Sequence, residues 1–175
     1  MEKLSTYNIA FKGLKEGNHL FDYHIRNSFF ELFENSLIEE AEADVTISLE
    51  KRNTFMSLHL DLKGSARLTC DRCLDQYDQE IANKADLIIK FGDSGYEDSD
   101  EVIWLHPEDY QFNVAQIIYD YIVLGIPLKH IHPDRQDGSS ECNPEMLEKL
   151  KEYSPLHEGK GDQRWIQLKN LLNNN

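Results

Sequence analysis

The 175-residue sequence has no apolar run near the roughly 20 residues that a membrane-spanning helix needs. Its first residues also lack the apolar region of a secretory signal peptide. It contains only three cysteines, an odd number that favours free or metal-bound thiols in a reducing compartment over a disulfide framework. These absences predict a cytoplasmic protein without membrane contact.

Basic residues are also scarce. Lysine and arginine number 18 against 32 aspartates and glutamates, so the formal net charge is -14. Proteins bind nucleic acid mainly by neutralising phosphates with lysine and arginine, and the average surface of this chain therefore repels RNA. Between Lys90 and Lys129 there is no basic residue at all. A solvated acidic surface is the simplest interpretation, and attraction of basic proteins is the second.

Catalytic motifs are missing as well. The sequence has no G-x-S-x-G, no H-E-x-x-H and no glycine-rich loop that could hold phosphates. Carboxylates between residues 93 and 101 could hold a hard cation, but their spacing matches no calcium loop. We therefore expect no enzymatic activity, and a nuclease has only these carboxylates in its favour.

What the sequence does contain predicts an α+β fold. Hydrophobic residues make up 40% of the chain, enough for one core, so we expect a single α+β domain over residues 1–153. Residues 154–175 are predicted to form a C-terminal tail, with a weakly attached helix at 164–172. Alternating apolar and polar residues predict strands at 7–11, 19–25, 43–50, 55–62, 66–70, 77–81, 85–91 and 102–105.

The pairing of these strands follows from the turns between them. We expect 7–11 to pair with 19–25, and 43–50 to form the strongest hairpin with 55–62. The second strand of that hairpin is expected to continue past Gly64, through a bulge, to Cys70. The result would be an antiparallel, strongly twisted sheet.

Three helices are predicted beside this sheet. The first runs from Ser28 to Leu37 with a capping box, and the main one from Val114 to Leu124, capped by Asn113. The third covers residues 145–153 after a proline at its first position. We expect the 114–124 helix to pack on one sheet face, the other helices to be peripheral, and residues 92–101 to form a mobile loop.

The sequence motif with the clearest chemistry is the C-x2-C turn of Cys70 and Cys73. A tetrahedral zinc ion could be bound there by both thiolates, by Cys142 and by one imidazole from His130, His132 or His157. The same pair could be a redox couple, although flanking strands are not the usual context. They could also be ordinary small residues near a strand end.

A weak RNA contact is predicted next to this turn. The cations concerned are Lys63, Arg67 and Arg72, with Tyr77 nearby as a surface for base stacking. Three cations in a chain with 32 carboxylates predict low affinity at cellular salt.

The order of these parts resembles the YceD family of large ribosomal RNA subunit accumulation proteins. The resemblance rests on the turn at 67–74, the helix that ends in Gly125-Ile126-Pro127-Leu128, the histidine-containing loop and the final cysteine, and it covers roughly residues 5–150. It implies Cys70, Cys73 and Cys142 as a metal or structural cluster, with zinc as the candidate ion. His132 is the candidate fourth ligand and His130 the alternative.

Membership would imply a role in accumulation or processing of large-subunit ribosomal RNA without catalysis. We therefore predict a ribosome-biogenesis factor that contacts ribosomal or RNA-processing proteins, with direct or indirect contact to the RNA. The acidic surface would suit capture of a basic ribosomal protein. The alternative is a zinc-binding or thiol-redox protein with an indirect effect on ribosomes.

Overall fold

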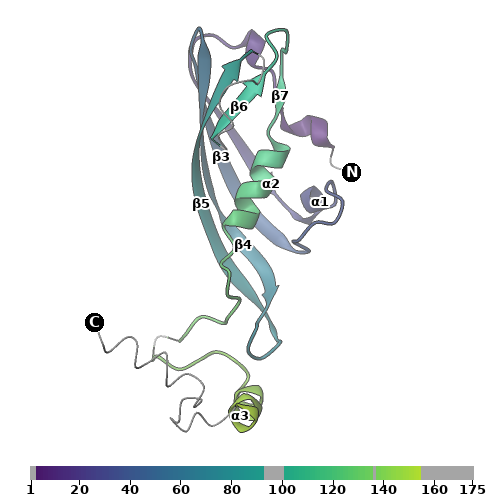
Figure 1. The fold of residues 1–175 in the computed structure, drawn as a ribbon, viewed down its shortest axis with the longest axis vertical. Coiled ribbons are helices and arrows are strands. Elements are labelled where there is room, and N and C mark those ends of the chain that lie inside the picture. Colours follow the sequence, from purple (N-terminus) through teal and green to yellow (C-terminus); the bar gives the residue numbers. More distant parts are fainter. Residues whose placement is uncertain (1–2, 93–100, 136, 155–175) are drawn as a thin grey trace, which may run out of the picture.

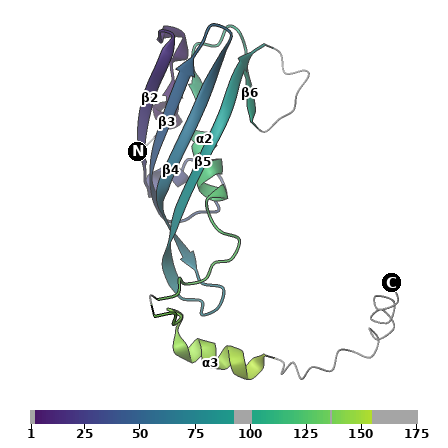
Figure 2. The ribbon, with the colours of Figure 1, turned by 90° about the vertical axis from the view of Figure 1, so that its left-hand side faces the viewer.

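The computed structural model describes residues 3–92, 101–135 and 137–154. Its main feature is a long, twisted five-stranded sheet with the order β2-β3-β4-β5-β6 (Figures 1 and 2). The strands are β2 (Gly17–Ile25), β3 (Ala41–Lys51), β4 (Phe55–Thr69), β5 (Gln76–Phe91) and β6 (Val102–Leu105). The first four are antiparallel, and the short β6 lies parallel to β5. The predicted α+β class and the 43–50/55–62 hairpin are confirmed.

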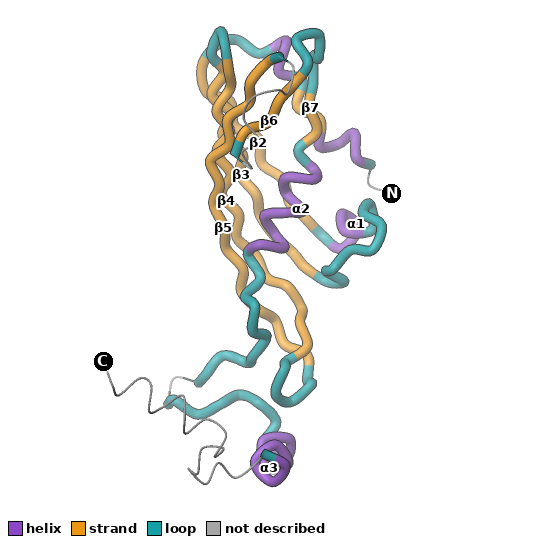
Figure 3. The backbone as a smooth tube through the Cα atoms, in the orientation of Figure 1, coloured by secondary structure: helices purple, strands orange, loops and turns teal. Residues whose placement is uncertain are grey.

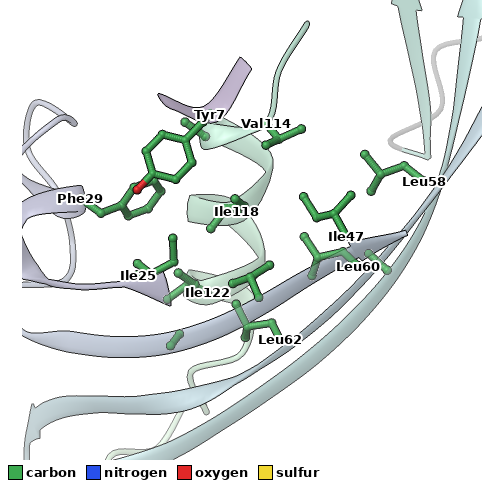
Figure 4. Packing of buried hydrophobic residues seen from close by; sticks show 14 of the residues in the cluster. Tyr7, Ile25, Phe29, Ile47, Leu58, Leu60, Leu62, Val114, Ile118 and Ile122 are labelled. Carbon is green, nitrogen blue, oxygen red and sulfur yellow. The ribbon is translucent and has the colours of Figure 1, made fainter. Parts of the chain in front are cut away.

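One face of this sheet carries the core. Strict alternation on β3 and β4 turns every second side chain inward, including Ile47, Leu60 and Leu62. Helix α2 (Ala115–Leu124) lies across that face and buries Ile118 and Ile122 completely (Figure 4). The predicted helix at 114–124 and its packing on the sheet are therefore confirmed. The other sheet face carries no described helix and is mostly polar.

The predicted pairing of 7–11 with 19–25 is wrong. Residues 4–13 form the 3-10 helices η1 (Leu4–Tyr7) and η2 (Phe11–Gly13), with the two-residue strand β1 (Asn8–Ile9) between them. β1 pairs with β7 (Phe112–Asn113), and β2 pairs with β3. The alternating apolar residues of this segment, Tyr7, Ile9 and Phe11, are buried in the core without joining the main sheet. Periodicity fixes which side chains turn inward but not which strand is the neighbour.

The predicted helix from Ser28 to Leu37 is also too long. Helix α1 covers only Asn27–Phe30, and the chain then turns, with Asn35 in the left-handed region at φ 58°. The Asn27 carboxamide accepts a hydrogen bond from the N–H of Ala41 at 3.1 Å. Phe29 and Phe30 are buried in the core, so a single helical turn is enough to place these two aromatic side chains there.

The expected bulge at Gly64 does not exist. β4 keeps continuous register with both neighbours, and Gly64 pairs with Ala43 on one side and Ile81 on the other. A side chain there would overlap the carbonyl oxygen of Glu42 and lie 2.6 Å from the Cα of Ala43. The glycine thus permits close approach of β3.

The remaining predictions divide between described and undescribed residues. Helix α3 (Pro144–Tyr153) is confirmed, and its N-cap Asn143 accepts from the N–H of Glu145 at 3.1 Å. The expected mobile loop, the 164–172 helix and His157 fall almost entirely outside the described residues. No described helix is long and apolar enough to span a bilayer.

Candidate metal centre

The C-x2-C turn closes the end of the β4–β5 hairpin, which extends beyond the rest of the sheet (Figures 1 and 3). The Cys70 N–H donates to the Asp75 carbonyl and the Leu74 N–H to the Cys70 carbonyl, each at 2.9 Å. Leu74 adopts φ 62°, an uncommon left-handed conformation for a leucine. This tight turn directs both cysteine side chains to the same buried side, as the sequence predicts.

A second segment is bound to the turn through Asp71. The Asp71 N–H donates to the His130 carbonyl at 2.6 Å, and the His130 N–H donates to the Asp71 carboxylate at 2.9 Å. These two bonds hold the loop that follows α2 against the turn. The loop then brings His132 and Cys142 to the two cysteines.

The four predicted ligands Cys70, Cys73, His132 and Cys142 do come together. Their ligand atoms all lie within 4.8 Å of one another. The Sγ atoms of Cys70 and Cys142 are 3.7 Å apart, and His132 Nδ1 is 3.4 Å from Cys73 Sγ and 3.7 Å from Cys142 Sγ.

These separations can be compared with those around a tetrahedral zinc ion. Zn–S bonds of about 2.3 Å and Zn–N bonds of about 2.05 Å place two sulfurs about 3.8 Å apart and a sulfur and a nitrogen about 3.6 Å apart. The three distances between these ligand atoms lie within 0.2 Å of those values. The arrangement therefore fits a tetrahedral ion with three thiolates and one imidazole.

The group is enclosed in its own small hydrophobic cluster. Cys70, Cys73 and Cys142 are 0%, 2% and 4% exposed, and Tyr77, Met146 and Leu147 pack around them. The Tyr77 ring lies 4.7 Å from the His132 ring, centroid to centroid. The packing of Tyr77, Met146 and Leu147 around the cysteines was not predicted from the sequence, although the apolar Met146-Leu147 pair after Pro144 was a signal for it.

The surroundings of Cys70 and Cys142 shift the pKa values of these two thiols in opposite directions. Burial raises the pKa of Cys70, but the backbone N–H groups of Cys73, Arg72 and His132 outweigh it and lower that pKa to about 6. Burial and the neighbouring Cys70 raise the pKa of Cys142. A thiolate on Cys70 is thus the favoured starting point for a metal ion, which binds the deprotonated form.

The other predicted site residues lie apart from this cluster. His130 contacts the turn through its backbone, and its side chain is not part of the ligand group. Arg72 lies exposed in the turn, Lys63 lies exposed on β4, and Arg67 Nη1 is 3.8 Å from the Asp78 carboxylate. The predicted stacking residue Tyr77 is 7% exposed and covered by the cluster. RNA contact by the three cations stays a prediction.

Comparison with known proteins identifies a family. A family model described as "Large ribosomal RNA subunit accumulation protein YceD" matches residues 58–172, a range that includes all four candidate ligands. No curated protein and no solved structure matches the chain.

Proposed function

Because the chain belongs to the YceD family of large ribosomal RNA subunit accumulation proteins, we propose that it is a non-catalytic factor supporting accumulation or processing of large-subunit ribosomal RNA. In this proposal the protein works in the cytoplasm, residues 1–153 act as one domain, and its contacts are with ribosomal or RNA-processing proteins and, directly or indirectly, with the RNA.

The group of three buried cysteines and the half-buried His132 is the observation that supports a structural and not a catalytic role. A zinc ion bound there would have all four positions filled by protein ligands, whereas catalytic zinc sites keep one position open for water or substrate. The ion would connect the hairpin tip to the loop and to α3. Its contribution would be folding energy at that end of the molecule.

The zinc content of the purified protein tests this part. After purification without added metal, we expect about one equivalent of zinc per chain, as a four-ligand structural site implies. The double variant C70S/C73S should lose it, whereas S139A, a hydroxyl change in the same loop but outside the ligand group, should keep it. Less than a tenth of an equivalent in the unmodified protein would contradict a zinc site.

Charge supports protein partners over bare RNA. With a net charge of -14, the chain attracts basic proteins such as those that bind ribosomal RNA. Capture of the tagged protein with and without ribonuclease distinguishes direct protein contact from contact through RNA. Partners that remain after nuclease, and that dissociate as salt rises, support direct protein contact; loss of all partners with the RNA contradicts it.

The cellular role is tested by removing the protein. We expect the ratio of large- to small-subunit ribosomal RNA to fall on depletion and to recover with the unmodified chain. An unchanged ratio in cells that lack the protein would overturn the proposal. Recovery with C70S/C73S would show that the cluster is not needed for it.

The alternative of a thiol-redox protein is favoured only by the 3.7 Å separation of the Cys70 and Cys142 sulfurs and the lowered pKa of Cys70. Zinc and a disulfide compete for the same sulfurs. A protein that carries zinc and resists oxidation by oxidised glutathione would exclude this alternative.

A further inference from the structure

A pocket of about 460 Å³ lies at the sheet end opposite to the cysteine turn, where η2 meets the β3–β4 hairpin (upper end in Figure 1). Lys12, Lys51 and Arg52 contribute three cations to its lining, and Phe11 and Phe91 contribute aromatic carbon. Its volume is within the range of small-molecule sites in proteins.

Lys51 is the unusual residue in this pocket. It continues the inward-facing row of β3 that runs through Ile47 and Leu49, so a lysine takes a position where the core pattern calls for an apolar residue. Its ammonium donates to the carbonyls of Phe11 at 2.9 Å and Leu14 at 2.8 Å. An ammonium has three donors, and no carboxylate within the described chain pairs with this one.

The charges that line this pocket differ from those of three other cavities in the described residues. Three other cavities, on the polar sheet face and near α1, are lined by more carboxylates than cations. Here three cations and two carboxylates line the pocket; Arg52 is ion-paired with Glu50 at 2.9 Å, whereas no carboxylate of the described residues pairs with Lys12 or Lys51. A half-buried, incompletely compensated cation favours an anionic ligand.

The uncharged part of the lining indicates what else the ligand carries. Phe91 is half-buried and lies 5.6 Å, centroid to centroid, from the ring of Phe11, which is only 3% exposed; the accessible apolar wall is therefore formed by Phe91, Leu14 and Pro107. Such a wall suits a flat, weakly polar ring. The remaining lining carboxylates, Glu16 and Asp109, are acceptors for the amino groups that nucleobases present.

We propose that this pocket binds a nucleoside phosphate, with the phosphate on Lys51 and Lys12 and the base against the apolar wall. The ligand is one nucleotide of single-stranded RNA or a free nucleotide, which share this chemistry. The preference for RNA as the source of this ligand rests on the proposed function. The proposal that the pocket binds a nucleoside phosphate does not rest on it.

The test measures binding of a fluorescein-labelled eight-nucleotide RNA to the purified full chain by fluorescence anisotropy at low salt. The pocket variant K12Q/K51Q should weaken binding about tenfold, because charge-assisted hydrogen bonds are lost. The matched control K149Q/K151Q removes two exposed cations from α3 and should change binding less than about twofold. The variant K63Q/R67Q removes two of the cations for which the sequence predicts an RNA contact.

Equal affinity of K12Q/K51Q and K149Q/K151Q, or weakening only in K63Q/R67Q, would overturn the proposal. Competition by adenosine monophosphate would identify a free nucleotide as sufficient, and competition by RNA alone would identify RNA as the source. Competition by inorganic phosphate as strong as by the nucleotide would overturn the base contact.

Two controls keep the result interpretable. Glutamine at position 51 retains N–H donors for the Phe11 and Leu14 carbonyls, and unchanged thermal unfolding checks that η2 stays in place. If the K51Q substitution unfolds the protein, the single variant K12E is tested in its place, because Lys12 is exposed. Loss of nucleotide binding would leave the depletion test of ribosomal RNA unaffected, so the two proposals fail separately.

Discussion

At the scale of single residues, the cysteine cluster depends on which histidine faces the sulfurs. His132 places Nδ1 3.4 Å from Cys73 Sγ, whereas His130 contributes its backbone to Asp71. We predict that H132A lowers zinc affinity by at least about 100-fold, since one of four ligands is lost, and that H130A changes it less than about threefold. Competition with a chromophoric chelator measures both. Equal losses would show that the imidazoles are interchangeable.

The lowered pKa of Cys70 and the raised pKa of Cys142 give a second prediction. With a pKa of about 6, Cys70 is roughly nine-tenths thiolate at pH 7, whereas burial and its neighbour keep Cys142 protonated. In metal-free protein, alkylation of Cys70 by iodoacetamide should rise with pH through a lower midpoint than that of Cys142, because the N–H groups of Cys73 and Arg72 that lower the Cys70 pKa belong to the turn itself. Cys142 should react only in more alkaline solution. Peptide mass spectrometry follows both sites, and a shared midpoint would contradict the separation.

At the scale of elements, the long strands depend on one close approach at Gly64. An alanine there overlaps backbone atoms of β3, which cannot move without disturbing two paired strands. We predict that G64A destabilises the fold by about 2–3 kcal/mol, the cost typical of overpacking. The control G13A adds a methyl group with no atom within 4 Å and should cost under about 1 kcal/mol. Urea unfolding measures both variants.

The same scale shows why some elements could be predicted and others not. The β3–β4 hairpin follows from strict alternation and a short turn, and α2 from an apolar stripe after Asn113. The partner of β1 is over 100 residues away at β7, and local periodicity carries no information about that pairing. The cysteine cluster was predicted because thiols and imidazoles have few other uses as a group. The Lys51 pocket was not predicted, because it forms only where η2 folds back over the end of the sheet.

At the scale of the whole molecule, the described chain contains two separate hydrophobic clusters. The large one joins the sheet, α1 and α2, and the small one surrounds the cysteines and receives α3. Leu68 packs against both, and α3 has no fully buried residue. Its contacts with the rest of the described chain are therefore few and centred on the cluster, through Met146 and Leu147.

Metal removal should consequently loosen one end of the molecule and not the other. After chelation, we predict that amide exchange in α3 and in residues 128–135 and 137–143 accelerates at least about tenfold, because these segments lose the ligands Cys142 and His132 as anchors. Amides in the centre of β3 and β4 should keep their protection, since their hydrogen bonds and core contacts do not involve the cluster. Hydrogen exchange with mass spectrometry, repeated on C70S/C73S, compares the two regions. Unfolding of the sheet together with α3 would show one cooperative unit, and unchanged exchange in α3 would show that the metal does not hold it.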